Sequence, residues 1–125
     1  MQARTFTILL VEDHEDIRSA IRTRLSHSGY EVFEAANGQQ GVELARAEVP
    51  DLIFMDLEMP ILNGFDAIEQ LQTDESCSHV PIIAVSNHCW DFDWKDKALA
   101  LGCAECMDKG KLISAFDDVL QRYVN

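Results

Sequence analysis

The run Leu52–Asp56 is the part of the sequence that most constrains the fold. Four consecutive apolar residues, Leu52 to Met55, end in Asp56, and Pro60 follows shortly after. The run is long enough for one strand and too short for a typical helix, and a strand that is apolar on both faces must be covered on both sides. It therefore predicts a parallel sheet with Asp56 at the carboxyl end of a central strand, the edge where open α/β sheets bind ligands.

Apolar runs and helical periods alternate along the whole chain. Strands are predicted at 6–11, 31–35, 52–56, 82–86 and 105–108. Between and after them, apolar residues recur at helical spacing, which predicts five helices, within 17–28, 38–49, 64–72, 92–101 and 112–123. The pattern predicts a single α/β domain over residues 1–125, a (βα)5 flavodoxin-like fold with parallel strand order 2-1-3-4-5 and helices on both faces.

The composition narrows the classes of partner. The chain has 22 acidic and 10 basic residues, for a net charge of −12. This charge argues against direct nucleic acid binding and suits a metal cation or a basic partner surface. Because no apolar run is long enough to cross a bilayer and the N-terminus lacks the apolar core of a signal peptide, we expect a soluble, cytoplasmic protein with no membrane contact.

The four cysteines do not form a complete motif. Cys103 and Cys106 have the spacing of half a zinc site, and Cys77 and Cys89 do not supply the other half. Their number is too low for a disulfide scaffold, and a cytosolic chain keeps its thiols reduced. We therefore favour a structural role for Cys103 and Cys106 over metal binding or redox chemistry.

Acidic residues follow two strands that this topology makes neighbours. Glu12 and Asp13 follow the first strand, and Asp56 ends the third. Three carboxylates in one place repel one another, and a divalent cation removes that conflict. Oxygen ligands favour Mg²⁺ over zinc. The alternative is that Glu12 and Asp13 only cap the first helix, where negative charge is favourable.

Two more strands end in residues of a kind used in phosphoryl transfer. Ser86 ends the fourth strand and Lys109 follows the fifth. A carboxylate nucleophile at Asp56 can form an acyl phosphate, while a cation and Lys109 neutralise the transferring oxygens. Ser86 could instead cap a helix and Lys109 could be a solvated charge. The joint occurrence at four strand ends favours phosphoryl chemistry.

At these positions the sequence resembles the receiver domain of two-component response regulators, the CheY-like family. The resemblance covers nearly the whole chain, in order and at near-family spacing. It rests on the segments 9–13, 56–60 and 81–86, on Asn63-Gly64, and on Lys109.

The resemblance implies a role for each matching residue. Asp56 would be the phosphoacceptor, which takes a phosphoryl group from a histidine kinase or phosphotransfer protein. Glu12, Asp13 and Asp56, with the backbone carbonyl of Glu58, would hold Mg²⁺. Ser86 and Lys109 would contact the phosphoryl group. Phosphorylation would remodel the surface of the fourth helix, fifth strand and fifth helix, so the domain would act as a switch for a downstream protein and not as an enzyme on other substrates.

Three positions depart from the family pattern. The family usually has Tyr or Phe three residues before the lysine, and here that residue is Cys106. The residue after Ser86 is usually small, and here it is Asn87. The lysine is usually followed by Pro, and here Gly110 follows. All three lie in the half of the domain that transmits the signal.

The segment 88–94 is rich in aromatic side chains. Trp90 and Trp94 are spaced as on one face of a helix with Ala98, while Phe92 points elsewhere. Core packing is expected for Trp94. We expect at least one of Trp90 and Phe92 to be exposed for partner binding.

Two alternative functions remain open from the sequence. One is an unphosphorylated pseudo-receiver that acts as a protein-interaction module, suggested by Asn87 and Cys106. The other is a Mg²⁺-dependent phosphatase with an Asp nucleophile, which would need a second catalytic Asp at position 58, where the chain has Glu58. Glu58 is also placed to influence an attacking water and the lifetime of an acyl phosphate.

Overall fold

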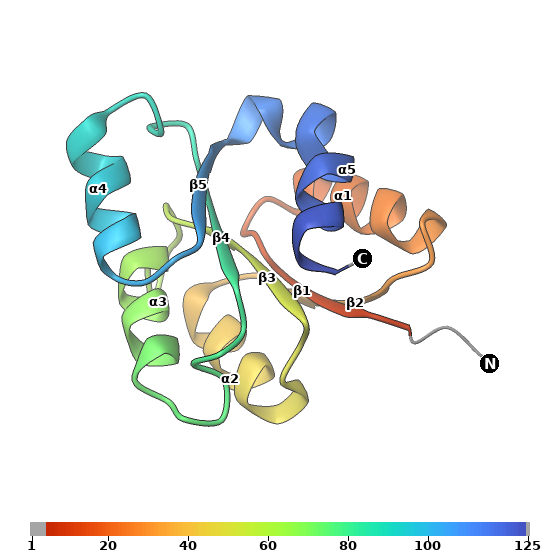
Figure 1. The fold of residues 1–125 in the computed structure, drawn as a ribbon, viewed down its shortest axis with the longest axis horizontal. Helices are drawn as coiled ribbons and strands as arrows, with labels where there is room; N and C mark the ends of the chain where they lie inside the picture. Colours follow the sequence, from red (N-terminus) through yellow and green to blue (C-terminus); the bar gives the residue numbers. More distant parts are fainter. Residues whose placement is uncertain (1–4, 125) are drawn as a thin grey trace.

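The sheet is parallel and five-stranded. The computed structural model describes residues 5–124 and orders the strands β2-β1-β3-β4-β5 (Figure 1). The strands are β1 (Thr7–Val11), β2 (Glu31–Ala35), β3 (Leu52–Asp56), β4 (Ile82–Ser86) and β5 (Glu105–Asp108). The predicted (βα)5 architecture and strand order are confirmed, with β2 at an edge.

Helices cover both faces of the sheet. They are α1 (Glu15–His27), α2 (Gly38–Glu48), α3 (Gly64–Gln72), α4 (Phe92–Ala100) and α5 (Leu112–Tyr123), and a short 3₁₀ turn (Lys109–Lys111) precedes α5. Helices α1 and α5 pack on one face, and α2, α3 and α4 pack on the other (Figure 1). No helix in the range 5–124 is long and apolar enough to cross a membrane.

The central strand shows why its sequence is continuously apolar. Alternate residues of a strand point to opposite faces. Ile53 and Met55 join the core under α2, α3 and α4, while Leu52 and Phe54 join the core under α1 and α5. All five residues of β3 are buried, so Asp56 ends a strand that is packed on both faces, at the carboxyl edge of the sheet.

Local sequence signals fix where the helices begin and end. Asn37 and Asn63 accept hydrogen bonds from backbone N–H groups at the starts of α2 and α3. Gly29 and Gly102 follow α1 and α4 with φ of +91° and +109°, a backbone conformation that favours glycine. The asparagine caps lie in loops that follow the carboxyl ends of β2 and β3, whereas the two glycines lie in loops that lead into the amino ends of β2 and β5.

Three details of the sequence interpretation are wrong. Trp90 does not lie on the face of α4, because Asp91 caps that helix through its side chain and the helix begins at Phe92. Ile21 and Leu25 are buried as the spacing predicts, but Ile17 is 36% exposed because it lies beside an open cavity. The first strand also begins one residue later than predicted, at Thr7.

Candidate functional site

Four strands bring polar side chains to the same edge of the sheet. Asp56 and Ser86 end β3 and β4, Glu12 and Asp13 follow β1, and Lys109 follows β5. In the register, Val11 pairs with Met55, Asp56 with Val85, and Ser86 with Asp108, so the strand ends are level. The juxtaposition predicted from the topology is therefore present, and its geometry can be measured.

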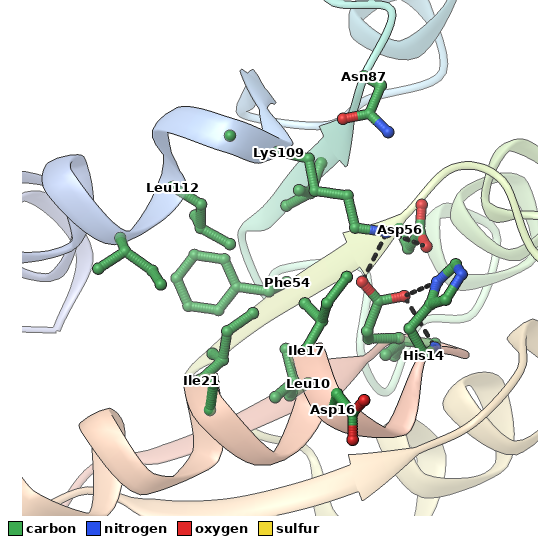
Figure 2. A pocket seen from close by; sticks show the side chains of 16 residues that line it. Leu10, His14, Asp16, Ile17, Ile21, Phe54, Asp56, Asn87, Lys109 and Leu112 are labelled. Atoms are coloured by element: carbon green, nitrogen blue, oxygen red, sulfur yellow. Dashed lines mark hydrogen bonds and ion pairs between the residues drawn. The ribbon is translucent and has the colours of Figure 1, made fainter.

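Lys109 connects the two most buried carboxylates. Its Nζ lies 2.6 Å from Glu12 Oε1 and 3.0 Å from Asp56 Oδ2 (Figure 2). Glu12 and Asp56 are each only 3% exposed. The other oxygen of Asp56, Oδ1, accepts a hydrogen bond of 3.0 Å from the backbone N–H of Glu58. Asp56 is thus fixed at both oxygens.

Their surroundings shift the pKa values of the two buried carboxyl groups in opposite directions. Burial, together with hydrogen bonding and repulsion from Glu12, raises the pKa of Asp56 to about 7. Burial also acts against ionisation of Glu12, but hydrogen bonds with Asp56, Lys109 and Asp13 outweigh it and lower its pKa to about 2. Without a cation other than Lys109, the crowded pair favours one proton on Asp56.

The acidic group includes an oxygen that lacks a hydrogen bond. Ligand atoms of Glu12, Asp13, His14 and Asp56 lie within 4.8 Å of one another. Oδ1 of Asp13 is buried and makes no hydrogen bond within residues 5–124, although His14 Nδ1 lies 3.3 Å from it. A buried carboxylate oxygen without a hydrogen bond is costly, and oxygen donors of this kind suit Mg²⁺. The donor set therefore fits a hard divalent cation.

Ser86 belongs to a second cluster beside the carboxylates. Its side chain is fully buried, and its Oγ lies 3.4 Å from Glu58 Oε1 and accepts a 3.0 Å hydrogen bond from the backbone N–H of His88. His88 Nε2 is 3.2 Å from the same Glu58 oxygen. The sequence interpretation did not find His88, or His14 beside Glu12; their positions two and three residues after the ends of β4 and β1 are the signal that could have indicated them.

A glycine allows the loop after β3 to fold against Asp56. A Cβ on Gly64 would clash with the backbone oxygen of Asp56 and would lie 2.6 Å from the Cα of Leu57. Gly64 is the first residue of α3, and its N–H donates to the Leu57 carbonyl at 3.1 Å. This close approach explains why Asn63-Gly64 begins the helix here.

An apolar cavity lies on the α1 and α5 side of the site. Its volume is about 600 Å³, and it extends from Asp56 and Lys109 between the two helices (Figure 2). Ile17 and Ile113 lie on its walls and are 36% and 53% exposed. The carboxylate site is thus open toward a surface with apolar character.

The aromatic segment 88–94, which runs into the first turn of α4, has one large side chain in the core and two in solvent. The ring of Trp94 packs edge to face on Phe65, with centroids 4.9 Å apart, and lies tilted against the ring of His88, with centroids 5.0 Å apart. Trp90 and Phe92 are 71% and 78% exposed. The predicted core packing of Trp94 is confirmed, as is the predicted exposure of at least one of Trp90 and Phe92, since both are exposed. A role of these two side chains in partner binding stays a prediction.

The chain matches known families over nearly its full length. Residues 8–118 match the family model described as the response regulator receiver domain. The polar-differentiation response regulator DivK of Brucella ovis is 30% identical over 120 residues, which cover 96% of this chain and 97% of that protein.

Solved structures show the same fold. The chemotaxis protein CheY4 of Vibrio cholerae superposes with a TM-score of 0.89 at 25% identity, covering 97% of this chain and all of that one. The receiver domain of the sensor histidine kinase PA1611 of Pseudomonas aeruginosa, with a magnesium ion coordinated in its active-site cleft, gives a TM-score of 0.87 at 31% identity, covering 96% and 98%.

Proposed function

Because this chain belongs to the family of response regulator receiver domains, we propose that it accepts a phosphoryl group on Asp56 and changes its binding to a downstream protein in response. The donor is a histidine kinase or a phosphotransfer protein. The observation that carries the proposal is the position of Asp56: a buried carboxylate at a strand end, held by Lys109 on one oxygen and a backbone N–H on the other.

The chemistry follows from this position. A carboxylate oxygen of Asp56 attacks the phosphorus of a phosphohistidine, forming an O–P bond as the N–P bond breaks and the imidazole leaves. The ammonium of Lys109, 3.0 Å from Asp56 Oδ2, lies where it can neutralise charge on the transferring oxygens. Only the ionised form of Asp56 is a nucleophile, so the proton favoured by its raised pKa must leave first.

The acidic residues fit a magnesium ion in this function. Glu12, Asp13 and Asp56, with the backbone carbonyl of Glu58, are the residues that would hold it. The buried Asp13 oxygen without a hydrogen bond supports this assignment. Bound Mg²⁺ supplies positive charge that lowers the cost of ionising Asp56 and offsets charge on the phosphoryl oxygens. The related PA1611 receiver domain carries magnesium in its cleft.

Ser86 is the residue that would report the phosphoryl group to the rest of the domain. Its hydroxyl is now directed to Glu58 and His88. A phosphoryl group on Asp56 offers a stronger acceptor than the 3.4 Å contact with Glu58, so Ser86 would exchange one partner for the other. The segment 87–91 follows Ser86 directly, and the exposed Trp90 and Phe92 are then the side chains whose surroundings change, along the surface of α4, β5 and α5.

The cavity between α1 and α5 is where we place the donor protein. A phosphohistidine must reach Asp56 from the open side of the site, and the cavity begins there. The exposed Ile17 and Ile113 give this opening apolar edges that a helix of the donor can cover.

Acetyl phosphate tests the proposal without a partner protein. With Mg²⁺, the wild-type chain should gain one phosphoryl group, and peptide mapping should locate it at Asp56. Chelation of Mg²⁺, or Asp13→Asn, should reduce the yield strongly, whereas Asp93→Asn, an exposed acid in α4, should leave it unchanged. Equal labelling with and without Mg²⁺ would contradict the metal assignment. No labelling would favour the unphosphorylated interaction module.

A further inference from the structure

Two cysteines that are distant in sequence meet next to the candidate site. Cys89 lies in the segment between β4 and α4, and Cys106 lies in β5. Their Sγ atoms are 2.6 Å apart, although the residues are 17 positions apart in the chain. This separation is little more than half an ångström above the length of an S–S bond, which is about 2.0 Å.

The sheet register explains why Cys106 faces Cys89. Cys106 pairs with Ala84 of β4 and packs with the core under α2, α3 and α4, whereas the next residue, Met107, packs on the opposite face. The segment that leaves β4 carries Cys89, whose Sγ contacts the Sγ of Cys106. Both cysteines are half-buried, so small oxidants can reach them.

We propose that Cys89 and Cys106 form an intramolecular disulfide under oxidising conditions, which ties the segment 87–91 to β5. The other two cysteines are less suited to this chemistry. Cys77 and Cys103 are 0% and 6% exposed, whereas the close contact between sulfurs joins Cys89 to Cys106.

The reaction balances with a small-molecule disulfide, such as oxidised glutathione, as the oxidant. One cysteine, as the thiolate, attacks it, forms a mixed disulfide and releases one glutathione thiolate. The second cysteine loses its proton, attacks the bound sulfur and releases the second glutathione. Two protein thiols are oxidised, one disulfide is reduced to two glutathione molecules, and the protein loses two hydrogen atoms.

The buried surroundings of the two thiols affect the rates of the two steps differently. Burial raises the pKa of the Cys89 thiol to about 12, and burial also raises the pKa of Cys106. The thiolate is therefore scarce at neutral pH, and the first step is slow. The second step is intramolecular between adjacent sulfurs, so the mixed disulfide resolves quickly to the Cys89–Cys106 link.

The link has a consequence that rests on the proposed function. Cys89 lies three residues after Ser86, and Cys106 lies three residues before Lys109. A covalent bond between them holds the segment 87–91 in its present position, where the His88 N–H donates to Ser86. We expect the oxidised protein to be phosphorylated severalfold more slowly by acetyl phosphate, because Ser86 is held toward Glu58 and His88.

The test uses the full chain, reduced, freed of reductant and incubated with excess oxidised glutathione at about pH 8 to supply thiolate. Free thiols are then alkylated, and the protein is analysed by intact mass and peptide mapping. We expect a loss of two hydrogen atoms and one cross-linked peptide pair joining Cys89 to Cys106. Cys77→Ser, the matched control, should keep the link, and Cys89→Ser should lose it.

Other results would overturn the assignment. These are a stable glutathione adduct on Cys89 or Cys106 without a link, a link that involves Cys103, or no change in mass. Equal phosphorylation rates of the reduced and oxidised protein would overturn the effect on Ser86. If the reduced protein is not phosphorylated at all, the proposed function fails, while the mass and peptide map still decide whether the disulfide forms.

Discussion

Replacing Lys109 with methionine removes the ammonium that contacts both buried carboxylates. The lysine side chain is 13% exposed and those of Glu12 and Asp56 are 4% exposed, so water replaces little of the lost interaction. Removing one member of a buried ion pair costs about 3–5 kcal/mol. In the variant, Asp56 can take up a proton and so avoid an unpaired buried charge. Protonation costs about 1.4 kcal/mol for each pH unit above the pKa of Asp56, so it limits the loss of stability. For the metal-free protein near pH 8 we expect Lys109→Met to lower the free energy of unfolding by about 2–4 kcal/mol.

The loss should depend on pH in a defined direction. The pKa of Asp56 is already raised to about 7, above its unfolded value of 3.8, and removal of Lys109 raises it further. A group with a raised folded pKa contributes stability that is complete at low pH and is lost as the pH rises through that pKa. In the wild type, Asp56 is ionised above about pH 7, so a further rise in pH causes no further loss of stability from this group. In the variant, Asp56 ionises at a higher pH, so the free energy of unfolding continues to fall as the pH rises above about 7. The deficit should be smaller near pH 6 than near pH 8.

Urea denaturation in the presence of a chelator measures both effects. Lys111→Met is the matched control, since Lys111 is an exposed lysine in the same turn, and its effect should stay within about 0.5 kcal/mol. Wild-type stability in the Lys109→Met variant near pH 8, or the same deficit at both pH values, would refute the reasoning.

Three other changes test the fold and the site. Gly64→Ala places a Cβ against the backbone of Asp56, so we expect a loss of about 1–3 kcal/mol in urea denaturation and slower phosphorylation; wild-type values would contradict the close approach. Phe116→Ala removes a fully buried ring that packs edge to face on the core, and should cost about 3–5 kcal/mol in the same assay; a cost under about 1 kcal/mol would be inconsistent with that packing. Ile17→Glu should slow phosphorylation by a donor protein but not by acetyl phosphate, while Leu99→Glu, an exposed apolar residue on α4, should change neither. Equal slowing with both donors would argue against docking at the cavity.

The bounds of β2, β3, β4 and β5 agree with the prediction. β3 and β4 are buried along their whole length, so their apolar runs have abrupt ends in sequence. β2 is an edge strand, and the alternation of its polar and apolar residues indicated its length. The predicted start of α4 at Phe92 also agrees with the structure. The assignment of Trp90 to a face of that helix was wrong, because the side chain of Asp91 caps the helix and leaves Trp90 outside it, although the spacing of Trp90 and Trp94 is helical.

The carboxylates and Lys109 were predictable because the sheet topology alone brings strand ends together. Contacts made by loop residues were not predictable from the sequence. The short spacing of Cys103 and Cys106 in the sequence draws attention to those two cysteines. In the structure, however, Cys106 of β5 contacts Cys89, which is 17 residues away. The contact of His88 with Glu58 likewise joins two loops whose conformations no periodic pattern encodes.

The most direct test of the central claim compares the wild type with Asp56→Asn after treatment with acetyl phosphate and Mg²⁺. Asparagine keeps the shape of the side chain and removes the nucleophilic carboxylate. Intact mass spectrometry should show one added phosphoryl group on the wild type and none on the variant. An unmodified wild type, or the same yield in Asp56→Asn, would contradict the account.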